Sequence, residues 1–108
     1  MDLDEYQKSA RRTAIYAEDH RVIYPALGLA SEAGEVAGKI KKVLRDQGGD
    51  FGSAPLEAIM DELGDVLWYV AALAGDLGLS LDEIAAANLG KLASRKERDR
   101  LSGGGDRR

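Results

Sequence analysis

The sequence predicts an all-α fold, and three observations support that prediction. The 108 residues are rich in Ala, Leu, Glu, Lys and Arg, which favour helices. The chain holds one Trp, four Tyr, one Phe and two Pro, which argues against a β-rich fold. Four stretches carry apolar residues at helical spacing. We therefore expect a four-helix bundle, and because so short a chain builds only a modest core, we expect it to complete that core by oligomerisation.

The first helix is expected from about Leu3 to Glu18, since apolar and small side chains recur along it every three or four residues. Pro25 fits the first turn of the second helix, where its missing N–H does no harm. That helix should reach roughly Leu44, with its core side formed by Leu29, Ala33, Val36, Ile40, Val43 and Leu44.

The run of residues 46–52 is a loop by composition. Ser53 is the expected N-cap of the third helix, which carries a broad apolar stripe and should end near Asp76. Ser80 to Glu83 reads S-x-x-E, a capping box that opens the fourth helix. We treat residues 1–101 as one all-α domain and residues 102–108 as a flexible, Gly-rich basic tail.

Charge and composition exclude several classes of protein. The formal net charge of −4 argues against general nucleic-acid binding. Without cysteine there is no zinc–thiolate site or thiolate nucleophile, and His20 is the single histidine. The chain shows no leader and no apolar run of about 20 residues, so we expect a cytoplasmic protein that does not enter a membrane.

Two acidic pairs are the most informative feature of the chain. Glu32 and Glu35 stand three residues apart in the second expected helix, and Glu62 and Asp65 do so in the third. Each pair leaves one face of its helix. If the two helices face each other, four carboxylates converge, and such a set suits Mg²⁺ or Mn²⁺. The alternative is that each pair forms a solvated helix edge.

The residues around these pairs resemble a known enzyme family. Residues 24–36, Y-P-A-L-G-L-A-S-E-A-G-E-V, and 61–69, D-E-L-G-D-V-L-W-Y, look like the two metal-binding helices of MazG-like nucleoside triphosphate pyrophosphohydrolases. That family has the pattern E-E-x-x-E followed by E-x-x-D. The resemblance continues through residues 88–92 and Arg95 to the ending G-G-G-D-R-R. Ser31 departs from the pattern, because it stands where the first glutamate is expected.

The resemblance implies Mg²⁺-dependent hydrolysis of a nucleoside triphosphate between the α and β phosphorus atoms, with Mn²⁺ as a possible substitute. The products would be the monophosphate and pyrophosphate, and the role would be the cleaning of nucleotide pools. Glu32, Glu35, Glu62 and Asp65 would be the metal ligands and catalytic residues, with Glu32 the candidate to help deprotonate water. The Ser31 departure leaves the number of metal ions open.

Substrate contacts are expected from residues outside the acidic pairs. The candidates for binding phosphate or nucleoside are Lys39, Tyr69, Asn88, Lys91, Arg95 and Arg108. Cations at the end of the fourth helix would also complement its dipole, and Lys39 would also pair with Glu35. Trp68 is expected to pack.

Two other functions and the assembly remain open. Phosphoribosyl-ATP pyrophosphohydrolase is a second enzyme of the same superfamily, and a non-catalytic helical assembly module is the third reading. The small size and the resemblance favour a homo-oligomer, a tetramer rather than a dimer.

Overall fold

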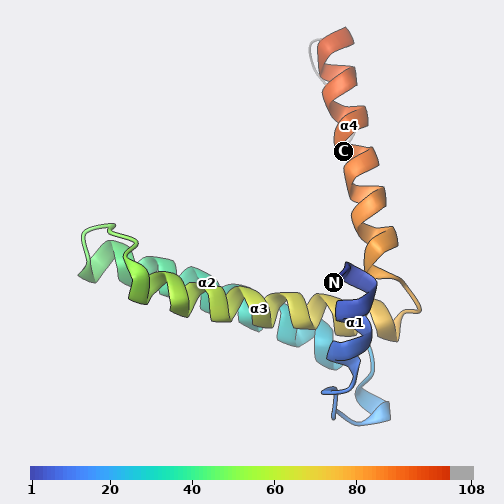
Figure 1. The fold of residues 1–108 in the computed structure, drawn as a ribbon, viewed down its shortest axis with the longest axis horizontal. Coiled ribbons are helices and arrows are strands. Elements are labelled where there is room, and N and C mark those ends of the chain that lie inside the picture. Colours follow the sequence, from blue (N-terminus) through green and yellow to red (C-terminus); the bar gives the residue numbers. More distant parts are fainter. Residues whose placement is uncertain (103–108) are drawn as a thin grey trace.

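The computed structural model describes the backbone of residues 1–102 and the side chains of residues 1–99. Over that part of the chain the structure is all-α, as predicted, and contains no strand (Figure 1). The elements in order are α1 (Leu3–Arg11), the 3-10 helix η1 (Glu18–His20), α2 (Ile23–Asp46), α3 (Ser53–Asp76) and α4 (Leu81–Ser102). The glycines and arginines of the expected tail, residues 103–108, lie outside the described residues.

Helices α2 and α3 form a long antiparallel pair, which is the frame of the molecule (Figure 1). The loop between them turns at Gly48 and Gly49, whose φ angles are 59° and 80°. Pro25 sits in the first turn of α2, as predicted, and Pro55 sits in the first turn of α3. The predicted N-cap of α3 was wrong by one residue: Gly52 is extended and caps the helix, and Ser53 is already helical.

Helix α1 is shorter than predicted, ending at Arg11 rather than near Glu18. The Thr13 hydroxyl donates a 2.7 Å hydrogen bond to the carbonyl of Ala10, competing for the backbone as threonines do. The same hydroxyl accepts a 2.7 Å hydrogen bond from the Trp68 indole of α3. This tertiary contact turns the chain out of the helix. Residues 12–22 therefore form a linking segment with only the short helix η1.

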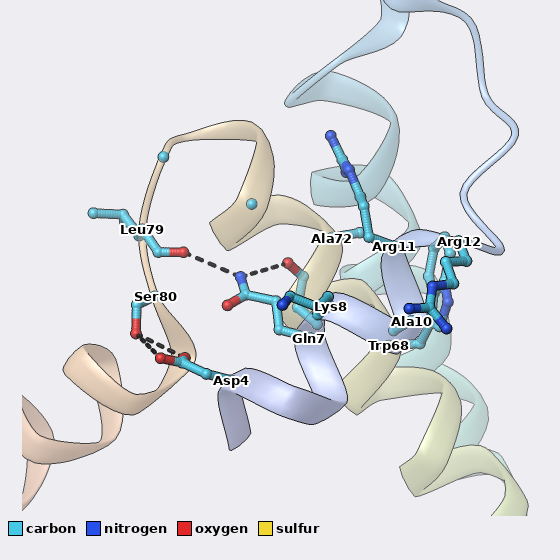
Figure 2. Close-up of a pocket in the computed structure, with 13 residues that line it drawn as sticks. Asp4, Gln7, Lys8, Ala10, Arg11, Arg12, Trp68, Ala72, Leu79 and Ser80 are labelled. Atoms are coloured by element: carbon cyan, nitrogen blue, oxygen red, sulfur yellow. Dashed lines mark hydrogen bonds between the residues drawn. The ribbon is translucent and has the colours of Figure 1, made fainter. Parts of the chain in front are cut away.

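A glutamine of α1 ties the turn between α3 and α4 to the rest of the fold (Figure 2). Gln7 donates through Nε2 to the carbonyls of Ala71 (3.2 Å) and Leu79 (3.1 Å). Its Oε1 accepts from the backbone N–H of Leu81 (3.1 Å). Because one side chain satisfies three backbone groups, it fixes where α3 stops and where α4 starts.

The start of α4 is capped from two sides. The N–H of Glu83 donates to the Ser80 hydroxyl at 3.2 Å, so Ser80 caps the helix and supplies one of the two bonds of the predicted capping box. The Ser80 hydroxyl in turn donates to the carboxylate of Asp4 at 2.8 Å, and the N–H of Asp82 donates to the same carboxylate at 3.0 Å. A capping box that was not predicted, between Asp2 and Glu5, opens α1.

Helix α4 leaves the α2–α3 pair and contacts α1 at its base (Figure 1). The radius of gyration is 17.3 Å, whereas a compact domain of this length has about 13 Å. The principal extents, 44 × 43 × 27 Å, reflect the two long arms. None of the described helices is both long enough and apolar enough to cross a membrane.

The buried core is correspondingly small. Its main cluster joins α3 to the start of α4 and consists of Ala71, Ala74 and Leu81, with Tyr6 and Val70 packed against it. Val43 and Ile59 are buried between α2 and α3 nearer the hairpin loop. Large apolar side chains elsewhere are exposed, including a stripe on α3 at intervals of four, three and four residues: Leu56, Met60, Leu63 and Leu67.

One close approach between α2 and α3 sets their spacing and predicts a mutational effect. A Cβ placed on Gly28 would overlap the ring of Tyr69, whereas one placed on Gly34 would meet nothing within 4 Å. Gly28→Ala should therefore lower the free energy of unfolding by about 1–3 kcal/mol through overpacking. Gly34→Ala is the matched control and should be neutral or stabilising by up to about 1 kcal/mol. Urea unfolding measures both, and equal effects would contradict the contact.

Candidate metal site

Three carboxylates meet between the two long helices. Glu32 comes from α2, and Glu62 and Asp65 come from α3. One carboxylate oxygen of each lies within 4.8 Å of the other two. Glu32 and Glu62 are half-buried, and Asp65 is exposed. Among the residues whose side chains are described, this is the one cluster of three or more acidic, histidine or cysteine side chains close enough to hold a metal ion.

The three carboxylates destabilise one another. The pKa of Glu32 is raised, first by a hydrogen bond with Glu62 and then by partial burial. The negative charges of Asp65, Glu62 and Glu35 raise it further. A cluster with this repulsion gains from a cation that neutralises it.

The donor set fits a hard divalent cation. All three donors are carboxylate oxygens, the ligand type that Mg²⁺ and Mn²⁺ prefer. Mg²⁺ is commonly held by a small number of carboxylates and retains waters or substrate phosphates as further ligands. Glu32, Glu62 and Asp65 therefore suit an ion that also contacts a phosphate.

Glu35 is the predicted ligand that does not join this cluster. Its side chain is exposed, and the group of converging oxygens does not include it. It stands three residues after Glu32 on α2, and its negative charge contributes to the raised pKa of Glu32. The sequence predicted four converging carboxylates, and the structure brings three together.

A cavity beside the carboxylates leads into a second, aromatic one. The first, of about 340 Å³, is lined by Thr13, Glu32, Asp65, Trp68 and Tyr69. The second, of about 310 Å³, shares Thr13, Trp68 and Tyr69 with the first. We call this second space the aromatic cavity, and its remaining lining residues are Ile15, Tyr16, Ala17, His20 and Tyr24.

The rings of the aromatic cavity pack on one another. Tyr16 stacks on Tyr24 with centroids 5.2 Å apart, and Tyr24 lies 6.4 Å from Tyr69. Trp68 meets Tyr69 edge to face at 5.0 Å. Burial raises the pKa of Tyr69, as do a hydrogen bond with Tyr24 and the charges of Glu32 and Asp65. The hydroxyl of Tyr69 therefore stays protonated and able to donate.

Tyr69 lies beside the carboxylates as the sequence suggested, and Trp68 packs while also lining both cavities. Sequence reasoning missed the contributions of Thr13, Tyr16 and Tyr24. A signal was present, because two of the four tyrosines of the chain, Tyr16 and Tyr24, stand close together just before the first acidic pair.

The predicted cationic contacts are not brought to the carboxylates of their own chain. Lys39 lines a separate cavity near the hairpin loop, together with Lys42 and Asp46. Asn88, Lys91 and Arg95 lie on α4, which projects away from the α2–α3 pair (Figure 1). Arg108, the remaining predicted contact, lies outside the described residues.

Comparison with known families agrees with this geometry. The family model of the MazG nucleotide pyrophosphohydrolase domain matches residues 24–98, which include the three carboxylates. The chain belongs to the MazG nucleotide pyrophosphohydrolase family. A similar protein is "Gene 37 protein" of Mycobacterium phage L5, 46% identical over 114 aligned residues that cover all of both chains. No solved structure matches the chain.

The match to the MazG family begins at residue 24 and so leaves out α1 and the linking segment, residues 12–22. The carboxylates are thus supplied by the part that defines the family. Thr13, Tyr16 and His20 in the walls of the two cavities come from the part before it.

Removing one carboxylate tests whether the cluster is built for a metal ion. Glu62→Gln should lower the affinity for Mn²⁺ measured by calorimetry. The thermal midpoint of the metal-free protein should stay the same or rise, because a repulsive charge beside Glu32 is lost. Glu57→Gln, an exposed glutamate of the same helix, is the matched control and should change neither. A large fall of the metal-free midpoint in Glu62→Gln would show that Glu62 is structural.

Proposed function

We propose that this protein is a Mg²⁺-dependent nucleoside triphosphate pyrophosphohydrolase. It would cleave a (d)NTP between the α and β phosphorus atoms to give the (d)NMP and pyrophosphate, with Mn²⁺ able to replace Mg²⁺. The observation that carries the proposal is the convergence of Glu32, Glu62 and Asp65 in a chain of the MazG family. Intracellular nucleotide pools supply such substrates, so we place the activity in the cytoplasm and assign it a pool-cleaning role.

The carboxylates would hold the cation, with Glu35 available at the edge of the cluster. The bound ion would supply charge neutralisation of the phosphates and a water of lowered pKa. We assign the role of base to Glu32, because it belongs to the cluster and also lines the cavity beside it. The aromatic cavity would take the sugar and base, with the Tyr69 hydroxyl beside the carboxylates.

A second copy of the chain would complete the site. A triphosphate beside an acidic cluster needs cationic side chains to offset the negative charge. The predicted ones, Lys91 and Arg95, lie on α4, which projects away from the α2–α3 pair of its own chain. The exposed stripe on α3 and a radius of gyration well above about 13 Å also fit a chain that packs against copies of itself. We therefore propose a homo-oligomer, a tetramer in preference to a dimer, in which α4 of one copy approaches the carboxylates of another.

A charge placed on the stripe tests this assembly. Leu56→Glu should reduce the mass measured by light scattering to that of a smaller assembly or a single chain, because a charge would be buried at the contact. Leu77→Glu is the matched control and should leave the mass unchanged. Leu77 is 53% exposed and Leu56 52%, but Leu77 lies away from the stripe. An unchanged mass in Leu56→Glu would contradict a contact through the stripe.

The reaction is tested by incubating the native protein with each (d)NTP and Mg²⁺ and measuring pyrophosphate and orthophosphate separately. We expect pyrophosphate and the monophosphate. Asp65→Asn should lower the rate by about 100-fold or more. Losing a side chain that binds the metal directly should cost at least as much activity as losing a side chain that only hydrogen-bonds to a metal ligand. Asp61→Asn, an exposed aspartate of α3 outside the cluster, should stay near the native rate.

Other outcomes of the same assay decide between the alternatives. Orthophosphate alone would indicate a different phosphatase, and no product with any (d)NTP would favour a non-catalytic assembly module. Turnover of phosphoribosyl-ATP in preference to every (d)NTP would identify the histidine-pathway activity instead.

A further inference from the structure

A buried carboxylate at the end of α3 gathers contacts from the linking segment and the residues next to it. The side chain of Asp76 has no exposed surface. It accepts hydrogen bonds from Arg11 Nη2 (2.6 Å), the Tyr16 hydroxyl (2.8 Å) and the backbone N–H of Val22 (2.9 Å). Arg21 Nε lies 3.6 Å from the same carboxylate. Asp76 thus contacts the last residue of α1 and both the middle and the end of the linking segment.

Val22 has a backbone conformation that needs support. Its φ and ψ are 68° and −55°, and the N–H of Ile23 donates to the carbonyl of Arg21 at 2.7 Å. Together these define a γ-turn with positive φ at its centre, a rare and strained form. A β-branched residue is especially unfavourable there. The backbone N–H of this strained residue, Val22, donates a hydrogen bond to the carboxylate of Asp76.

The segment held in this way forms one wall of the aromatic cavity. Thr13, Tyr16 and His20 of the segment line that cavity together with Trp68 and Tyr69 of α3. Its other side-chain bond to the rest of the fold, among residues 1–99, is the 2.7 Å bond from Trp68 to Thr13. The remaining hydrogen bonds of the segment close its own turns or join it to the neighbouring helix. Tyr16 also accepts a 3.1 Å hydrogen bond from Arg11 and stacks on Tyr24. Among the described groups that attach the wall to the rest of the fold, Asp76 is the one that holds the segment at several points.

Asp76 is ionised despite its burial. Burial alone would raise its pKa, but the bonds from the Val22 amide, Arg11 and Tyr16 outweigh burial and lower the pKa below its ordinary value. Replacement by the isosteric amide would remove the charge that faces two guanidinium groups. It would also place N–H donors opposite donors, which leaves buried groups unsatisfied.

We propose that Asp76 is a positioning residue for nucleotide recognition, which it serves by holding the linking segment as the wall of the aromatic cavity. It touches neither the carboxylate cluster nor the substrate, and it acts through Tyr16 and Val22. The inference rests on the proposed function for its ligand. The inference goes beyond the proposed function because the partners of Asp76 lie in residues 11–22, before the part of the chain that matches the MazG family.

The first test separates recognition from catalysis. In Asp76→Asn, the KM for the best (d)NTP of the panel should rise about 10-fold or more, as expected for the loss of hydrogen bonds to a buried charge. The kcat should stay within about 3-fold, and the Mn²⁺ affinity should be unchanged, because Glu32, Glu62 and Asp65 are held by the α2–α3 packing. Asp46→Asn, which removes the exposed pair with Arg45 at the other end of the hairpin, is the control and should leave all three unchanged.

An unchanged KM in Asp76→Asn would overturn the proposal. So would a joint loss of kcat and Mn²⁺ affinity, which would mean that Asp76 supports the fold as a whole. If Asp76→Asn does not fold, Arg11→Gln replaces it, because Arg11 contacts Asp76 but does not line the aromatic cavity. The KM should then rise by about 3-fold or more with kcat retained; an unchanged KM again overturns the proposal.

The second test needs no substrate. In Asp76→Asn, hydrogen exchange should speed up in residues 12–22 and stay slow in the parts of α2 and α3 that hold the carboxylates. Trp68, the single tryptophan of the chain, should shift its emission to longer wavelength as the wall loosens. Unchanged exchange in residues 12–22 would overturn the proposal. Because exchange is read without turnover, native protein that hydrolyses no (d)NTP would contradict the proposed function and leave this holding role to be decided on its own.

Discussion

The packing of α2 against α3 is the interaction on which the rest of the structure depends. It presses half-buried Glu32 and Glu62 together although their charges oppose the contact. The apolar contacts around Val43 and Ile59 and the ring of Tyr69 on Gly28 hold the pair in register against that repulsion. The cluster thus lowers the stability of the metal-free protein locally, and a bound cation would restore it. Sites prepared for a ligand are often destabilising in this way.

The helical parts of the site could be predicted because they follow from local rules. Spacing of three residues puts Glu62 and Asp65 on one face whatever the rest of the chain does. The apolar periodicity of α2 and α3 then turns those faces toward each other. Glu35 shows where this reasoning stops, since small differences in how the two helices rotate decide which oxygens meet. The Asp2–Glu5 capping box carried the same kind of local signal, D-x-x-E, and could have been predicted.

Contacts between distant residues account for what could not be predicted. The early end of α1 depends on Trp68 reaching Thr13 across 55 positions of sequence. The direction of α4 depends on Gln7 and Asp4 fixing its first turn. Likewise, nothing near Asp76 in sequence indicates that it accepts a bond from a strained Val22. Propensity and periodicity describe each helix by itself, and these contacts are outside their reach.

Because two single helices supply the acidic cluster, its tolerance to insertions and deletions differs sharply along the chain. The loop of residues 47–52 closes the hairpin at the far end, so added residues there would leave the carboxylates where they are. One residue removed inside α2 between Glu32 and Val43 would instead rotate everything on one side of it by about 100° relative to α3. Among related chains, insertions and deletions should therefore accumulate in that loop, whereas the number of residues between Glu32 and Val43 should stay the same.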